Sequence, residues 1–268
     1  MRQPHYGWGV KLNDVAPLLS VRGITKRFGG FTAVDKMSFD LKPGAIGGLI
    51  GPNGAGKTTI FNTIAGLLLP DSGEVILDGK PIQRLPPHRI FASGLSRTFQ
   101  IPRPFPEMSV LENIMLVPSG QAGEAFWNNW LRPNLVAHQE RASRNRAEEI
   151  LEFCGLSGVH RDQASTLSGG QLKLLELARV LMADPKIILL DEPAAGVNPS
   201  LMNTLVDKIQ ALNTQGYTFL IIEHNMDMVM SICNPITVMS QGKLLYQGDA
   251  EGARHNQNVL DAYLGDLP

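Results

Sequence analysis

The sequence predicts an α/β protein with a largely parallel sheet, a small antiparallel sheet beside it and an inserted helical segment. Apolar strand-like runs at 187–191, 218–223 and 236–240 alternate with helical patterns at 201–213 and 226–233, which is typical of parallel α/β architecture. Between residues 100 and 167 the pattern changes to helices, which indicates the insertion.

The N-terminal part of the chain contains short strand-like runs separated by turn residues. These runs cover residues 19–21, 34–41, 46–50 and 74–77. Turns at 71–73 and 78–79 flank the last of them, which favours an antiparallel arrangement beside a core.

Three further helices are expected, one among these strands and two within the inserted segment. Residues 58–69 carry apolar side chains at helical spacing, and Pro70 is expected to end that helix. Ser109 and Glu112 form a capping-box pattern at the start of a second helix. Residues 139–155 form a third, with one apolar stripe that comprises Ala147, Ile150, Leu151 and Cys154.

Composition and charge argue against a nucleic-acid-binding, membrane-spanning or secreted protein. The net charge of −1 gives no electrostatic footprint for a nucleic-acid partner. No apolar run approaches the roughly 20 residues of a membrane-spanning helix, and the first 18 residues lack the pattern of a signal peptide. We therefore expect a cytoplasmic protein with a loose extension at 1–18. Cys154 and Cys233 are expected to be buried apolar side chains rather than a disulfide.

A glycine-rich loop, Gly51–Thr59, follows the apolar run at 46–50 and precedes a predicted helix. Glycines let the backbone N–H groups approach a phosphate chain, and the helix directs its positive end at the same anion. Lys57 is predicted to reach the β- and γ-phosphates, and the hydroxyl of Thr58 to bind Mg²⁺. The alternative is a glycine-rich turn with an incidental lysine.

Asp191 and Glu192 follow four aliphatic residues at the end of a predicted buried strand. Ligands of such sheets bind beyond the carboxyl ends of the strands. We expect Asp191 to hold Mg²⁺ through water and Glu192 to polarise the water that attacks the γ-phosphate. The alternative is a strand end with two solvated acids.

Two more features complete a characteristic order along the chain. Leu167-Ser168-Gly169-Gly170-Gln171 lies between the phosphate loop and the paired acids, and His224 comes after the acids at the end of another apolar run. With the phosphate loop and the paired acids, this order resembles the ATP-binding subunit of an ABC transporter, from about residue 19 to 264. The resemblance implies a P-loop ATPase with a RecA-like core. It also implies an extension at 1–18 and an ATPase domain at 19–268, with a helical subdomain inserted at about 101–180.

The resemblance also implies a nucleotide site made by two ATPase subunits. ATP and Mg²⁺ would be held by a set that comprises Asn53, Gly54, Ala55, Gly56, Lys57, Thr58 and Thr59. The segment Ser168, Gly169, Gly170 and Gln171 would meet the γ-phosphate held by the partner subunit. There the glycines would expose N–H groups behind an N-cap serine.

Three further residues have implied roles, each with a plainer alternative. His224 would contact the γ-phosphate, or else bond a loop carbonyl. Gln100 would bind Mg²⁺ and water and move with the helical subdomain, or else be a surface amide. Phe28 would stack on adenine, with Phe31 as competitor and a core aromatic as the alternative.

One position departs from the family's pattern. Asn198 stands where the D-loop usually carries an acid, so the hydrogen-bonding capacity is kept and the charge is lost. The cross-subunit contact of this loop is therefore expected without its usual charge.

Local details indicate the kind of transporter. Residues 192–199, the ending at 259–265 and the long segment at 117–145 are similar to the larger ATPase of importers for branched-chain and other neutral amino acids. The alternatives are the ATPase of a urea importer, the ATPase of a lipopolysaccharide exporter and a soluble ABC ATPase without a transport role. The implied partners are a second, related ATPase, two transmembrane permease subunits and, indirectly, a substrate-binding protein. The implied place is the cytoplasmic face of the inner membrane.

Two segments are candidates for contact with the membrane subunits. Trp127 and Trp130 would share a helix face, and packing within the helical subdomain is the favoured interpretation. Residues 101–110 are the better docking candidate, through Pro102, Phe105 and Met108.

Overall fold

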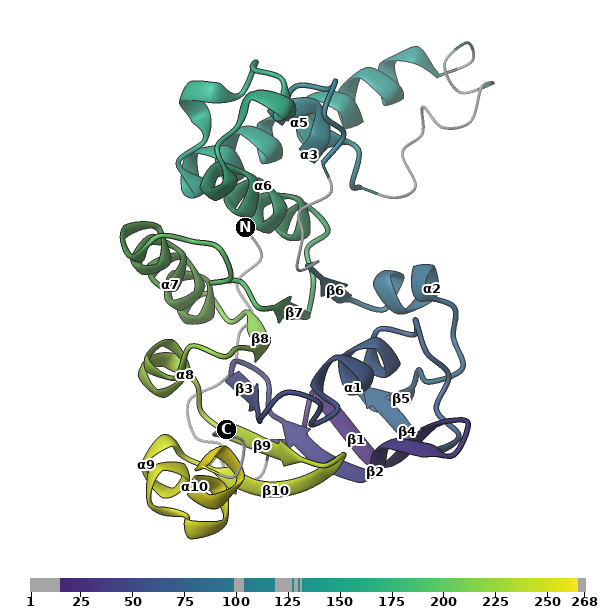
Figure 1. Ribbon diagram of the computed structural model, residues 1–268. Coiled ribbons are helices and arrows are strands. Elements are labelled where there is room, and N and C mark those ends of the chain that lie inside the picture. Colours follow the sequence, from purple (N-terminus) through teal and green to yellow (C-terminus); the bar gives the residue numbers. More distant parts are fainter. Residues whose placement is uncertain (1–14, 99–103, 119–126, 128–129, 131, 265–268) are drawn as a thin grey trace.

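The computed structural model describes residues 15–98, 104–118, 127, 130 and 132–264. Gln100, Pro102 and most of the predicted extension lie outside the described residues. A six-stranded sheet occupies the centre of the described part, and a four-stranded sheet lies beside it (Figure 1).

The six-stranded sheet has the order β10-β9-β3-β8-β7-β6. Its strands are β3 (Ile46–Ile50), β6 (Leu95–Arg97), β7 (Ile187–Asp191), β8 (Thr218–Ile222), β9 (Ile236–Ser240) and β10 (Lys243–Gly248). Neighbours pair in parallel except β9 and β10, which are antiparallel. Strands β3, β7 and β8 are buried at every residue, which explains why their sequences read as continuous apolar runs.

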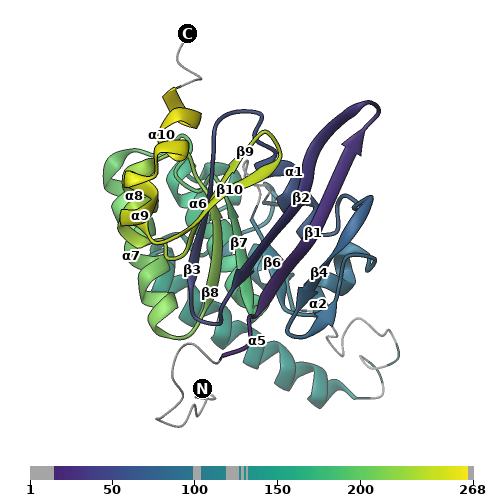
Figure 2. The ribbon, with the colours of Figure 1, turned by 90° about the horizontal axis from the view of Figure 1, so that it is seen from below.

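Alternate residues of the central strands face two different cores, as the period of two requires. Ile188 and Leu190 of β7 pack into a core with helices α5, α6, α7 and α8. Ile187 and Leu189 pack into the other core, with α1 and the antiparallel sheet. Figure 2 shows this layering, with α7 and α8 on one side of β3 and β8 and the antiparallel sheet on the other.

The antiparallel sheet has the order β2-β1-β4-β5. Its strands are β1 (Leu19–Phe28), β2 (Phe31–Leu41), β4 (Ser72–Leu77) and β5 (Lys80–Pro81). The predicted antiparallel arrangement is confirmed. The first strand is longer than its apolar start at 19–21, because it continues as a hairpin in which Phe28 pairs with Phe31.

The helices fall into two groups. Those around the sheets are α1 (Lys57–Ile64), α2 (Pro87–Ala92), α7 (Pro199–Thr214), α8 (Met226–Ile232), α9 (Ala250–His255) and α10 (Gln257–Leu264). The others are α3 (Val110–Met115), α5 (Pro133–Cys154) and α6 (Gly169–Met182), with short 3-10 turns at Ser157–Val159 and Ala164–Thr166. This second group packs together beyond the edge strand β6 (Figure 1).

Helix α1 is shorter than predicted. It ends at Ile64, and the expected continuation to Leu69 is wrong. Gly66 has a left-handed φ of 74°, and a Cβ atom there would lie 2.5 Å from Cδ1 of Ile90. The N–H groups of the next two residues turn back to the carbonyl of Asn62. A glycine C-terminal motif therefore ends the helix before Pro70 can.

Other local expectations are confirmed. Ser109 and Glu112 cap each other's backbone N–H groups at the start of α3. The predicted stripe is the buried face of α5. That helix begins at Pro133, six residues before the predicted start, with proline in its first turn.

The two cysteines are free and buried, as predicted. Burial raises the pKa of each thiol to about 12, which makes both poor nucleophiles near neutral pH. No helix in the described part of the chain is both long and apolar enough to cross a bilayer.

Candidate functional site: a phosphate loop facing two acids and a histidine

The glycine-rich loop connects the central strand β3 to α1. Gly56 occupies the N-cap position of α1 with φ 99°, and no side chain caps the helix. A Cβ atom on Gly56 would lie 2.4 Å from the carbonyl oxygen of Ala33, so the loop passes close to β2. Asn53 and Gly54 are exposed. The loop therefore presents an uncapped helix start beside an exposed glycine-rich turn, as an anion site requires.

Replacing Gly56 by alanine should destabilise the folded chain. The new Cβ atom would meet Ala33, and alanine would have to keep a φ of 99°, so we expect a loss of about 1–3 kcal/mol in the free energy of unfolding. Urea unfolding measures this change. Gly158→Ala is the matched control, because nothing lies within 4 Å of its Cβ position and its φ is not positive. Equal stability of the two variants would contradict the close approach.

Lys57 folds its side chain back over the loop. Its ammonium nitrogen donates to the carbonyl oxygens of Gly51 at 2.7 Å and Pro52 at 2.9 Å. Burial lowers the pKa of Lys57, and the negative charge of Glu192 opposes that shift. An anionic ligand here would act in the same direction as Glu192 and favour the charged ammonium. Lys57, the residue predicted to bind phosphate, thus lies at the loop and interacts electrostatically with Glu192, the predicted catalytic acid.

Asp191 ends β7, and its side chain is only 8% exposed, so the alternative of a solvated strand-end acid does not apply to it. Its Oδ2 atom accepts a hydrogen bond of 2.6 Å from Nη2 of Arg97. Sequence reasoning missed this arginine, although it stands only three residues before Gln100 in the chain. The Asp191 backbone N–H donates to the hydroxyl of Thr98 at 3.4 Å.

Glu192 and His224 lie together beyond the ends of β7 and β8. Nε2 of His224 is 2.9 Å from Oε1 of Glu192, so this histidine bonds an acid rather than a loop carbonyl. The two residues meet because β7 and β8 are parallel neighbours whose carboxyl ends share one edge. Glu192 has a φ of 49°, a sparsely populated conformation for a non-glycine residue. A carboxylate and an imidazole in contact can together orient and polarise a water molecule.

Glu223 is a second residue that sequence reasoning did not assign. It is buried, and its carboxylate accepts backbone hydrogen bonds from Ala194, His224 and Asn225. It therefore ties the loop after Glu192 to the loop that carries His224. An acid at the end of an apolar strand was the only signal in the sequence.

The segment Ser168–Gln171 begins α6. The hydroxyl of Ser168 accepts the backbone N–H of Gln171, and Oε1 of Gln171 accepts the backbone N–H of Ser168. This reciprocal cap leaves the N–H groups of Gly169 and Gly170 without a cap. In Figure 1, α6 lies with α3 and α5, apart from α1 and its loop. The fold does not bring this segment to its own phosphate loop.

Phe28 and Phe31 face each other near the turn of the first hairpin. Their exposed fractions are 48% and 65%, so neither is a core aromatic. The ammonium of Lys26 lies 5.5 Å from the centre of the Phe28 ring. Asn198 is exposed and caps α7 through its side-chain oxygen, which accepts the N–H of Leu201 at 2.9 Å.

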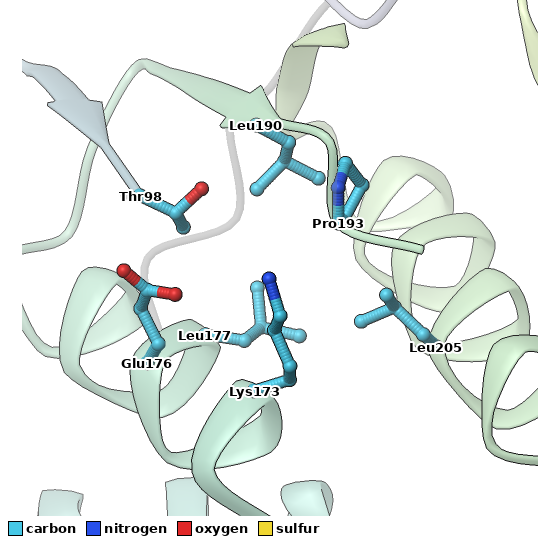
Figure 3. A pocket seen from close by; sticks show the side chains of 7 residues that line it. All are labelled: Thr98, Lys173, Glu176, Leu177, Leu190, Pro193 and Leu205. Carbon is cyan, nitrogen blue, oxygen red and sulfur yellow. The ribbon is translucent and has the colours of Figure 1, made fainter. Parts of the chain in front are cut away.

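A small hollow lies where the helical group meets the ends of β6 and β7. Figure 3 shows Lys173 and Glu176 of α6 pointing into it, opposite Thr98 and Leu190. Its remaining lining residues are Leu177, Pro193 and Leu205. Lys173 and Glu176 of α6 thus lie close to the end of β6, and Gln100 follows this strand in the sequence.

The two tryptophans do not pack within the helical subdomain, which was the favoured interpretation. Trp127 is 70% exposed and Trp130 is 85% exposed, so the interpretation that they fill the helical subdomain is wrong. Phe105 of the docking candidate is 51% exposed, and the guanidinium of Arg179 lies 5.8 Å from its ring centre.

Comparisons with known proteins agree on one family. The family profile described as ABC transporter matches residues 34–195. The high-affinity branched-chain amino acid transport ATP-binding protein LivG of Escherichia coli (strain K12) is 41% identical over 251 residues, which are 93% of this chain and 98% of that protein. A probable branched-chain amino acid transport ATP-binding protein LivG of Archaeoglobus fulgidus is 39% identical over 251 residues, with 92% and 95% covered.

Solved structures give the same result. A nucleotide-free ATP-binding cassette from an ABC transporter has a TM-score of 0.80 at 36% identity, covering 94% of this chain and 100% of that one. A cassette in its ADP conformation has a TM-score of 0.81 with the same identity and coverage.

Proposed function

The chain belongs to the ABC transporter family and is an ATPase, and we propose that it powers the import of branched-chain or other neutral hydrophobic amino acids. The observation that carries the cargo class is the likeness to branched-chain amino acid transport ATP-binding proteins at about two-fifths identity over more than nine-tenths of the chain. An ATPase of a urea importer, a lipopolysaccharide exporter or a soluble non-transport protein remains the alternative outcome of the test below.

The nucleotide would lie along the loop and the start of α1. Lys57 would exchange its two carbonyl partners for phosphate oxygens, while Asn53, Gly54, Ala55, Gly56, Thr58 and Thr59 would surround the phosphate chain. Phe28, half-exposed on its hairpin, would stack on the adenine. The uncapped N–H groups of α1 support this arrangement, because they are otherwise left without side-chain partners.

The residues present fit a magnesium ion held partly by the nucleotide. Thr58 offers an exposed hydroxyl and Asp191 a carboxylate, both hard oxygen donors. Among the described residues no group of three or more His, Cys, Asp or Glu could hold a metal by itself. That agrees with an ion that shares its coordination with phosphates and water. Mg²⁺ would neutralise phosphate charge, with Thr58, Asp191 and Gln100 as its protein contacts.

Glu192 would take the proton of the attacking water, and His224 would hold both that water and the γ-phosphate. The contact of 2.9 Å between their side chains supports a joint role. Lys57 would stabilise the charge on the phosphates. Gln100 would link this chemistry to the helical subdomain.

A second, related ATPase would complete the site. Because α6 lies apart from the phosphate loop of its own chain, Ser168, Gly169, Gly170 and Gln171 are available to a nucleotide held by a partner. ATP would then bridge two subunits and favour the closed state, and hydrolysis would release it. We propose that the chain comprises an extension at 1–18 and an ATPase domain at 19–268, with a helical subdomain inserted at about 101–180.

The chain would act at the cytoplasmic face of the inner membrane, bound to two transmembrane permease subunits and indirectly to a substrate-binding protein. The exposed Phe105 and tryptophans of the helical group supply apolar surface for such a contact.

Affinity purification of this chain from native membranes tests the proposal. We expect two different membrane subunits, a second ATPase and an amino-acid-binding protein among the co-purifying proteins. Recovery of urea- or lipopolysaccharide-handling subunits would change the cargo. Ribosomal or DNA-bound proteins without membrane subunits would overturn the transport role and leave the ATPase chemistry standing.

A further inference from the structure

The guanidinium of Arg97 joins three elements of the proposed ATP site. Nη2 donates to Oδ2 of Asp191 at 2.6 Å, and Nη1 donates to Oδ1 of Asn62, also at 2.6 Å. The guanidinium carbon lies 5.6 Å from the ring centre of Phe61. Asn62 and Phe61 belong to α1, Asp191 ends β7, and Arg97 itself ends β6. One nearly buried side chain therefore connects the phosphate-loop helix to the acid at the end of β7.

The contact with α1 falls one helical turn after Thr58. Asn62 follows Thr58 by four positions in the helix, so the two side chains lie on the same face. Arg97 thus bonds Asp191 directly and bonds the helical turn next to Thr58. These are the two described residues to which the proposed function gives a role at the magnesium ion.

The two oxygens of the Asp191 carboxylate have different surroundings. Oδ2 is held by Arg97, whereas Oδ1 makes no hydrogen bond within the described part of the chain and is not among the buried unpartnered atoms. A fixed carboxylate with one free oxygen can accept a hydrogen bond from a metal-bound water while keeping its orientation.

We propose that Arg97 is the positioning residue of the magnesium site, setting the orientation of Asp191 and its place relative to Thr58. The proposal rests on the proposed function, because it takes Asp191 and Thr58 as the contacts of the ion. Arg97 does not touch the nucleotide or the ion. It acts through Asp191.

The local energetics argue against a role in stability alone. Nε of Arg97 is buried and has no hydrogen-bond partner among the described residues, which costs free energy that an apolar side chain would not. A buried ion pair is also a weak source of net stability, because desolvation offsets its attraction. What arginine supplies here is a planar fork that bonds two oxygen acceptors in fixed directions. Lysine, a single flexible ammonium, cannot hold both at that geometry.

Arg97→Lys and Arg97→Gln in the full chain test this role. The readout is the affinity for a fluorescent ATP analogue, measured with Mg²⁺ and again with EDTA. We expect the Mg²⁺ concentration for half-maximal enhancement of binding to rise about tenfold, since one charge-assisted contact orients the carboxylate, while the affinity in EDTA stays unchanged. Electron paramagnetic resonance of Mn²⁺ should show weaker retention of the ion in the nucleotide complex.

Arg22→Gln is the matched control. Arg22 also lies on a strand and pairs with an aspartate, Asp40, at 2.8 Å, but it belongs to the antiparallel sheet. We expect it to leave the Mg²⁺ dependence unchanged. Asn62→Ala gives a graded variant, because it removes one arm of the fork and keeps the bond to Asp191. Its Mg²⁺ requirement should rise less than that of Arg97→Gln.

Equal losses of affinity with Mg²⁺ and with EDTA in the Arg97 variants would overturn the inference and make Arg97 a structural residue. An unchanged Mg²⁺ requirement in Arg97→Lys would also overturn it. Asp191→Asn separates this failure from that of the proposed function. If Asp191→Asn alters the Mg²⁺ requirement and the Arg97 variants do not, only the inference fails. If Asp191→Asn leaves the requirement unchanged, the proposed magnesium site itself is wrong.

Discussion

Glu192→Gln should bind ATP with near-normal affinity and lose turnover by about a hundredfold to ten-thousandfold, the range for removing a positioned general base. The amide has the shape of the acid and can still bond Nε2 of His224, now 2.9 Å from the carboxylate, so the loop geometry should survive. What it loses is the ability to take a proton from water. Multiple-turnover phosphate release and equilibrium binding of ATP measure the two quantities separately.

Glu148→Gln is the matched control for this variant, because it makes the same chemical change on the exposed face of α5. It should keep normal turnover. His224→Ala should also slow turnover strongly. The double variant Glu192→Gln with His224→Ala should be little worse than the slower single variant, since groups that act as a unit are not additive. Brisk multiple-turnover hydrolysis by Glu192→Gln would remove this residue from the water-polarising role.

The sequence predicts the parallel core well because its central strands are buried on both faces. A strand with helices on one side and another sheet on the other must be apolar at every position, and β7 and β8 meet that requirement. The meeting of Glu192 and His224 is predictable for the same reason. Both follow such strands, and parallel neighbours place their carboxyl ends at one edge.

Contacts between distant elements were not predictable in the same way. The bond of Arg97 to Asp191 joins residues 94 apart in the chain, and no local pattern of charge or period marks it. The end of α1 depends similarly on tertiary packing. Gly66 takes its left-handed conformation where a side chain would meet Ile90, a residue of α2 more than twenty positions later. A prediction from helical spacing alone extends the helix beyond Gly66, because Leu67 and Leu68 are apolar.

The tryptophans illustrate a different limit. Two aromatic residues three apart favour a common helix face, but spacing does not say whether that face meets a core or solvent. Trp127 and Trp130 are the most exposed large apolar side chains of the described residues. Their exposed fractions show that this face meets solvent in the described part of the chain.

Lys57→Ala should weaken ATP binding about tenfold to a hundredfold without loss of folded stability. A hydrogen bond to a charged group is worth about 1.5–3 kcal/mol, and Lys57 is the cation that we propose to contact the phosphates. Stability should be spared because burial already disfavours the ammonium, as the lowered pKa of Lys57 indicates. Its bonds to Gly51 and Pro52 offset that cost only in part.

Isothermal titration with a slowly hydrolysed ATP analogue, together with urea unfolding, distinguishes these effects. Lys186→Ala is the matched control, since Lys186 pairs with Asp78 at the start of β7, the opposite end of that strand from Asp191. It should keep normal affinity. Lys57→Arg should bind ATP nearly as poorly as Lys57→Ala, because a bulky planar guanidinium cannot take the place of a compact ammonium at the phosphate loop. Unchanged binding in Lys57→Ala would defeat the assignment of Gly51–Thr59 as the phosphate loop. A parallel loss of binding and stability would instead make Lys57 a structural side chain that holds the loop closed.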